Sequence, residues 1–159
     1  MSHQQSHGEG SSKPYSNMRK IKNKLVLLGD VSVGKTSLAT RYDDPSCRFQ
    51  KNEMPLHVTS TMGAQFITLT LPVGENELQF DIWDTAGQER FKSLGALYYK
   101  TAKGALVVFD ITVEKSFHRA KEWISELHQN AEPDIVISLV GNKTDLESER
   151  KVSREVSCE

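Results

Sequence analysis

One segment of eight residues limits the possible folds of this chain more than any other. The run G-D-V-S-V-G-K-T at residues 29–36 fits the pattern G-x-x-x-x-G-K-[ST]. It directly follows the apolar run Leu25–Leu28, which is typical of a strand buried on both faces, and it opens an amphipathic segment from Thr36 to Tyr42. A strand, a glycine-containing turn and a helix in this order predict a loop whose N–H groups bind a phosphate. A chance Gly-rich turn is the alternative, and the surrounding strand and helix argue against it.

Strands and helices alternate along the rest of the chain. Phe66–Leu71 and Leu78–Ile82 alternate apolar with polar residues, and Pro72–Asn76 between them supplies turn residues, so this region predicts a β-hairpin. Ala105–Phe109 and Ile135–Val140 are two further runs of the buried type. Each is preceded by a segment with helical spacing.

The clearest helical pattern is expected to begin near Ser116, which is a good N-cap residue. Its apolar residues fall on one face of the helix, and they are Phe117, Ala120, Ile124 and Leu127. Strands that alternate with helices predict an α/β fold with a mostly parallel sheet and one antiparallel hairpin strand.

Composition restricts what such a domain can bind. The chain has 159 residues, enough for one domain, and its 37% hydrophobic and 26% charged residues are typical of a globular protein. Its 20 Lys and Arg balance 21 Asp and Glu, for a formal net charge of -1. No global basic field is therefore available to hold nucleic acid, and a phosphate ligand must be bound locally.

The ends of the chain and its two cysteines carry weaker signals. Residues 1–20 are rich in Ser, Gly, Gln and His, so we expect a disordered extension before a domain of residues 21–159. Cys47 and Cys158 are too few for a disulfide framework, which favours a reducing, cytoplasmic setting. Neither end carries a lipidation motif, and no apolar run approaches the ~20 residues of a membrane span.

Two further motifs distinguish between the classes of phosphate-binding protein. D-T-A-G-Q at residues 84–88 ends the third predicted strand, where Asp84 can hold a Mg²⁺ water and Gly87 can offer its N–H to a γ-phosphate. Lys35 would reach the β- and γ-phosphates, and the Thr36 hydroxyl would bind Mg²⁺.

The third motif, N-K-T-D at residues 142–145, follows the fifth predicted strand. It therefore falls at the carboxyl edge of the sheet, where ligands of open α/β folds collect. The Asp145 carboxylate can accept hydrogen bonds from both N1–H and the 2-amino group of guanine, whereas adenine offers neither donor. These motifs disfavour a P-loop kinase or ATPase.

In this order, and each at a strand end, the three motifs resemble those of the Ras-like small GTPases. W-D-T-A-G-Q-E-R-F at residues 83–91, followed by Y-Y-K at 98–100, looks like the switch II segment of the Rab branch. T-M-G-A-Q-F at 61–66 and S-F-x-x-A-K-x-W at 116–123 are most similar to its early-endosomal members. The resemblance runs from about Lys22 to the end of the chain and implies a Ras-like G domain of the P-loop NTPase class.

The resemblance implies a switch of vesicle and endosomal traffic that binds GTP or GDP with Mg²⁺ and hydrolyses GTP slowly. It gives Gln88 the role of orienting the attacking water, and it places Phe49 on the guanine, although an ordinary loop aromatic is the alternative for Phe49. The nucleotide contacts expected are Gly29, Ser32, Val33, Gly34, Lys35, Thr36, Ser37, Phe49, Thr61, Gly87, Asn142, Lys143 and Asp145. The metal contacts expected are Thr36, Thr61 and Asp84.

The family also implies protein partners and membrane association. An exchange factor, a GTPase-activating protein and Rab effectors are expected to bind through Phe49–Phe66 and Gln88–Lys100. The family associates with endosomal membranes.

Three features depart from the family pattern. Thr61 lies 26 residues after Lys35, further than usual, although added loop length costs little closure entropy and Thr61 can still reach the metal. Val31 stands where Ras has glycine and many Rab proteins have serine, so it is expected to crowd the γ-phosphate and slow hydrolysis.

The third departure is the end of the chain. After Leu146–Lys151, which reads as a loop, and Ser153, a possible helix N-cap, the chain stops at Glu159, before the family's last strand and helix. The alternative function is therefore a truncated, non-catalytic interaction protein that competes for Rab effectors or exchange factors.

Overall fold

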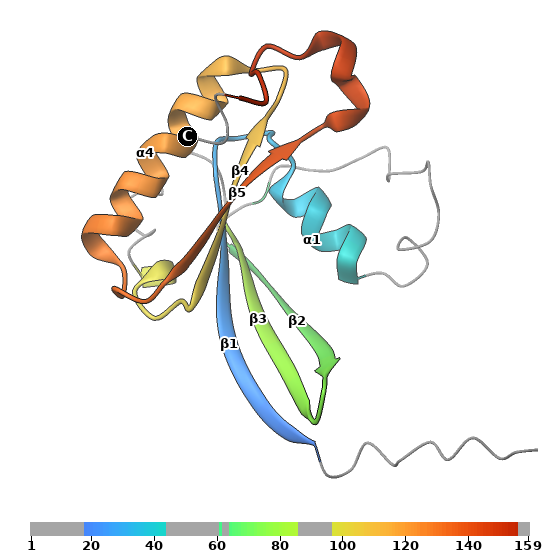
Figure 1. Cartoon of the computed structure of the whole chain (residues 1–159), viewed down its shortest axis with the longest axis vertical. Helices are drawn as coiled ribbons and strands as arrows, with labels where there is room; N and C mark the ends of the chain where they lie inside the picture. The colour runs from blue at the N-terminus through green and yellow to red at the C-terminus, as the bar shows by residue number, and fades with distance from the viewer. Residues whose placement is uncertain (1–17, 44–60, 62–63, 86–96, 156–159) are drawn as a thin grey trace, which may run out of the picture.

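The computed structural model describes residues 18–43, 61, 64–85 and 97–155 (Figure 1). Its centre is a five-stranded sheet in the order β2-β3-β1-β4-β5. The strands are β1 (Arg19–Leu28), β2 (Ala64–Val73), β3 (Asn76–Thr85), β4 (Gly104–Asp110) and β5 (Val136–Asn142). β1 pairs in parallel with β3 and β4, β4 pairs in parallel with β5, and β2 pairs antiparallel with β3. The predicted α/β architecture with one antiparallel strand is confirmed.

Two helices cover opposite faces of the sheet, as Figure 1 shows for α1 (Lys35–Asp43) and α4 (Glu114–Asn130). On one face, α4 places Phe117, Ala120 and Leu127 against side chains of β1 and β4. On the other face, Ala39 of α1 packs with Leu27 of β1 and with side chains of the hairpin. Burial on both faces explains the continuous apolar run at the end of β1.

The hairpin is longer than its apolar pattern suggests. Its turn consists of Gly74 and Glu75 alone, and Gly74 has a φ of +60°. The sequence pattern predicted a longer turn. Its outer residues belong to the ends of the two strands instead, and they are Pro72, Val73 and Asn76. Pro72 is compatible with β2 because β2 is an edge strand.

The predicted start of the long helix is wrong by three residues. α4 follows Val113, and Ser116 lies inside its first turn rather than at the N-cap. The buried Ser116 hydroxyl donates to the Val113 carbonyl at 2.6 Å and accepts from the Asp110 N–H at 3.0 Å. Ser116 thus links the helix to the end of β4 instead of capping it.

Three other boundaries also differ from expectation. Arg19 and Lys20, placed in the expected disordered extension, belong to β1, where they pair with β3. β5 is an edge strand with Val136 70% exposed, so it is not buried along its whole length. The expected loop after Asp145 is a short 3-10 helix, η3 (Thr144–Glu149), kinked at Leu146.

Ser153 does not begin a helix within the described residues, because turn geometry follows it at Arg154 and Glu155. Residues 1–17 and 156–159 lie outside that part. None of the described helices combines the length and apolar character that spanning a membrane demands.

Candidate functional site

The three sequence motifs meet at the carboxyl ends of the parallel strands. The segment Gly29–Thr36 joins β1 to the start of α1, and Asp84 lies near the end of β3. Asn142 is the last residue of β5, and Lys143–Asp145 follow it directly. Strand order places β1 between β3 and β4, with β5 beside β4, so all three motifs share one edge of the sheet. This is the edge at which open α/β sheets bind ligands.

The glycine-containing loop has a backbone that two of its glycines make possible. Gly29 has a φ of +138°, and a Cβ there would lie 2.1 Å from the Val108 carbonyl oxygen of β4. Gly34 has a φ of +98°, and a Cβ there would lie 2.2 Å from Nδ2 of Asn142. Close approach to two neighbouring strands therefore requires glycine at both positions.

Lys35 is buried inside the curve of this loop, 5% exposed. Its ammonium donates to the carbonyls of Gly29 at 3.0 Å and Asp30 at 2.7 Å. Burial lowers the pKa of Lys35 to about 8, although the negative charges of Asp84 and Asp30 act in the opposite direction. The side chain is thus mainly charged at neutral pH and is held against the loop by two of its carbonyl groups.

Oxygen atoms of three predicted metal contacts come together beside Lys35. The Thr36 hydroxyl donates to Asp84 Oδ2 at 2.5 Å, and the Thr36 and Thr61 hydroxyl oxygens are 2.5 Å apart. Because the Thr36 proton is directed to Asp84, the Thr61 hydroxyl is the donor to Thr36. Thr61 therefore lies beside the loop, despite its distance from Lys35 in the sequence.

These oxygens fit a magnesium ion. Asp84 is fully buried, and its Oδ1 accepts no hydrogen bond from the described residues. Those residues contain no cluster of three His, Cys, Asp or Glu side chains, so a cation here needs hydroxyl and ligand oxygens in addition to Asp84. Mg²⁺ is commonly held in this way, by one or two carboxylates and substrate phosphates.

Electrostatics at Asp84 support the same conclusion. Burial raises the pKa of Asp84 above its ordinary value, and the hydrogen bond from Thr36 and the charge of Lys35 oppose that effect. A cation beside Oδ1 would favour the ionised carboxylate.

The predicted base-reading motif touches the phosphate loop directly. Asn142 Nδ2 donates to the Val33 carbonyl at 2.8 Å, across 109 residues of sequence. Lys143 has a φ of 64° and a ψ of 40°, a left-handed conformation that costs a residue with a side chain about 1–2 kcal/mol. Asp145 follows in the first turn of η3 and is exposed.

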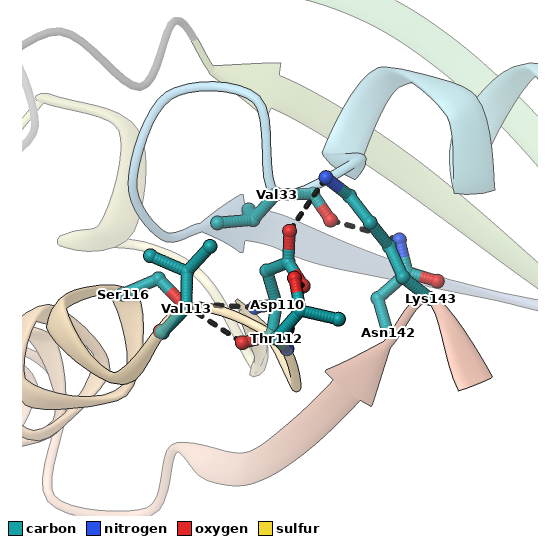
Figure 2. A network of polar contacts seen from close by, with 7 residues as sticks. All are labelled: Val33, Asp110, Thr112, Val113, Ser116, Asn142 and Lys143. Carbon is teal, nitrogen blue, oxygen red and sulfur yellow. Dashed lines mark hydrogen bonds and ion pairs between the residues drawn. The ribbon is translucent and has the colours of Figure 1, made fainter. Parts of the chain in front are cut away.

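The structure adds a residue that the motifs do not contain. Asp110 ends β4 at this edge, is 3% exposed, and forms an ion pair with Lys143 at 2.5 Å (Figure 2). Burial favours a higher pKa for Asp110, but hydrogen bonds from Lys143 and Thr112 and the charge of Lys143 hold it below its ordinary value. A charged residue directly after the apolar run 105–109 was the available sequence signal.

The remaining predicted contacts have different outcomes. Ser32 lies exposed in the loop with a φ of 62°, and Ser37 is half-buried in the first turn of α1. Phe49, Gly87 and Gln88 lie outside the described residues, so their roles remain predictions.

Comparison with protein families matches residues 24–159 to the Ras family. The chain is 48% identical over 141 residues to the Ras-related protein RABF2a of Arabidopsis thaliana, covering 88% of this chain and 66% of the relative. It is 48% identical over 144 residues to the GTP-binding protein ypt5 of Schizosaccharomyces pombe, covering 90% of this chain and 65% of the relative. The chain spans slightly less than two thirds of the length of these relatives. From the family match and these identities, the chain belongs to the Ras family, as a Rab-type member.

Proposed function

We propose that this chain binds GDP and GTP together with Mg²⁺, hydrolyses GTP slowly, and acts as a Rab-type switch in vesicle traffic. The observation that carries the proposal is the meeting of three motifs at one sheet edge: the phosphate loop, the Thr36–Asp84 oxygens and the Asn142–Asp145 segment. Ras-family membership and a relative named as a GTP-binding protein support it.

At the phosphate end, the chain supplies positive charge and rigid geometry. Lys35 and the loop N–H groups bind the phosphate oxygens, and Thr36, Thr61 and Asp84 are the residues that would hold the metal. Bound Mg²⁺ would neutralise charge that develops on the phosphates during hydrolysis. Gln88 orients the attacking water, and since phosphoryl transfer depends mainly on such positioning, intrinsic turnover is slow without a partner.

At the base end, Asp145 selects guanine. Its carboxylate accepts from N1–H and from the 2-amino group, and each charge-assisted bond contributes roughly 1.5–3 kcal/mol. Adenine leaves this carboxylate without donors, which costs binding.

Partner proteins bind a surface that includes an aromatic cluster formed by Phe66, Trp83 and Tyr98. The rings of Phe66 and Trp83 meet edge to face at 5.5 Å, and Tyr98 lies 5.5 Å from Trp83. Phe66 is 52% exposed, and Lys24 Nζ lies 5.1 Å from the Trp83 ring. Trp83 and Tyr98 are half-buried beneath the exposed Phe66 ring. Aromatic side chains at the surface are frequent anchors at interfaces, which supports effector and regulator binding through Phe49–Phe66 and Gln88–Lys100. Its Rab-type relatives support association with membranes of the endosomal pathway.

The decisive experiment compares GDP with IDP, which lacks the 2-amino group, on the wild-type chain and on Asp145→Ala. We expect the wild type to bind GDP about 12- to 150-fold more tightly than IDP, which corresponds to one charged hydrogen bond. Asp145→Ala should bind both nucleotides with equal affinity, because the acceptor for the 2-amino group is gone. ADP is the control and should bind neither protein measurably.

The same titrations test the alternative. A folded wild-type chain that binds no guanine nucleotide would contradict the switch and favour a non-catalytic interaction protein. Equal affinity of the wild type for GDP and IDP would contradict the role of Asp145.

A further inference from the structure

Asp110 is a buried carboxylate at the edge where nucleotide is proposed to bind, yet it belongs to none of the three motifs. It ends β4 and lies opposite Asn142 of β5 in the strand register. The Ile111 N–H donates to the Asn142 carbonyl at 3.2 Å. This hydrogen bond holds the ends of β4 and β5 side by side. Asp110 therefore lies next to the base-reading segment without being part of it.

The two oxygens of Asp110 face in different directions, as Figure 2 shows. Oδ1 accepts from the Thr112 N–H at 2.9 Å and from the Thr112 hydroxyl at 2.7 Å. Oδ2 pairs with the Lys143 ammonium at 2.5 Å. One oxygen thus fixes the turn that follows β4, and the other holds a side chain of the neighbouring segment.

Lys143 is the residue whose backbone sets the course of that segment. It takes the left-handed conformation between Asn142, which bonds to the phosphate loop, and Thr144, where η3 begins. The Leu146 N–H also donates a hydrogen bond to the Lys143 carbonyl at 2.9 Å. A tether on the Lys143 side chain therefore constrains Asn142 on one side and Asp145 on the other.

We propose that Asp110 is a positioning residue for the bound base. Through Lys143, it holds Asn142 and Asp145 in place around guanine and slows nucleotide release. This inference rests on the proposed function, and it adds to the base site a residue that does not touch the nucleotide.

The test is the release rate of fluorescent GDP and IDP from the full chain loaded with Mg²⁺. Asp110→Asn retains an oxygen for Thr112 but replaces the acceptor for Lys143 with an amide. We expect about tenfold faster GDP release and a smaller difference between GDP and IDP, as for the loss of one charged hydrogen bond.

Thr112→Val is the matched control, because it removes a hydrogen bond to the same carboxylate and leaves the Lys143 pair intact. Its release rates should equal those of the wild type. A rate as fast as that of Asp110→Asn would show that Asp110 acts only on its own turn, and would overturn the proposal.

A double-mutant cycle with Lys143→Met tests the contact from the other side, with Asp110→Ala in place of Asp110→Asn if the latter does not fold. Lys143 is itself an expected nucleotide contact, so Lys143→Met alone should release GDP quickly whatever the role of Asp110, and the coupling between the two positions is the readout. In the Lys143→Met background, Asp110→Asn should add little, because the two changes remove one interaction. Fully additive effects would contradict the proposal.

The wild-type result separates the two levels of inference. A folded wild-type chain that binds no guanine nucleotide would overturn the proposed function and the role of Asp110 together. A clear wild-type preference that Asp110→Asn leaves unchanged would overturn the role of Asp110 alone.

Discussion

Val31 is the residue of the phosphate loop whose side chain is expected to slow GTP hydrolysis. It is an apolar side chain 47% exposed to solvent, directly after Asp30, whose carboxylate accepts from the Val31 N–H at 2.8 Å. That bond restrains the backbone that carries the branched side chain.

We therefore predict that Val31→Ser hydrolyses GTP faster than the wild type. Replacing the two methyl groups with one hydroxyl reduces the bulk expected near the γ-phosphate, and a gain of about tenfold corresponds to ~1.4 kcal/mol of barrier. Single-turnover hydrolysis of preloaded GTP, with and without an activating partner, measures the effect. Equal rates in both proteins would contradict it.

Asp110 gives the unfolding free energy a defined dependence on acid pH. Its pKa in the folded protein is below the ordinary value of 3.8, because bonds from Lys143 and Thr112 outweigh burial. The folded state therefore holds this proton less tightly than the unfolded state, and the stabilisation is present above pH ~4 and lost as pH falls further. Urea unfolding between pH 5 and 3 should show a steeper decline for the wild type than for Asp110→Asn. Parallel curves would contradict the ion pair.

Local motifs explain why most site residues were predictable from the sequence. Lys35 and Thr36 belong to the phosphate-loop motif at residues 29–36, and Asp84 lies near the end of β3, whose apolar pattern is visible in the sequence. Asp110 was not predictable, because its role depends on Lys143, which is 33 residues further along the chain and adjacent only after β4 and β5 pair.

At the scale of elements, Gly29 and Gly74 both lie in turns with a positive φ, but their surroundings differ. Gly29 begins the phosphate loop against the backbone of β4, whereas a Cβ on Gly74 in the hairpin turn would meet nothing within 4 Å. Both have a positive φ, so alanine is strained at either position, but only at Gly29 does its Cβ also clash with a neighbouring strand.

We predict that Gly29→Ala lowers the free energy of unfolding by about 3 kcal/mol, and Gly74→Ala by about 1 kcal/mol. Urea unfolding of both variants without added nucleotide, beside the wild type, measures the difference. Equal losses would mean that β4 moves aside to admit the methyl group.

Element types were predictable where their periodicity was strong, as in the hairpin and α4. Element boundaries were less so, and Ser116 shows the reason. A serine before an apolar helical pattern fits an N-cap, but its hydroxyl bonds to Val113 and Asp110, so the helix starts earlier. Arg19 and Lys20 were misplaced because pairing with β3, rather than their own polarity, makes them strand residues.

At the scale of the whole molecule, one face of the sheet is hollowed by a groove of about 500 Å³. Leu25, Phe80 and Leu106 form its apolar floor, and Val136 at the edge strand lines it. Within the described residues no strand pairs with the outer side of β5, and an apolar groove beside such an edge favours self-association.

We predict that Val136→Lys raises the concentration at which the chain begins to scatter light, with a melting temperature close to that of the wild type. Val136 is 70% exposed, so a lysine there buries little charge. Val73→Lys, at an exposed strand position away from the groove, is the control and should leave scattering unchanged. Equal protection by both variants would show that net charge, rather than the groove, controls association.

The alternation of side chains along β3 brings two parts of the proposed switch close together in the sequence. Trp83, in the aromatic cluster, and Asp84, in the metal-type oxygen group, are consecutive residues on opposite faces of one strand. Under the proposed function, the carboxylate that would hold the cation and the ring expected to contact a partner belong to residues joined by a single peptide bond. A shift of the β3 backbone at Asp84 on cation binding would therefore reach the Trp83 ring directly, without passing through the side chains of the core.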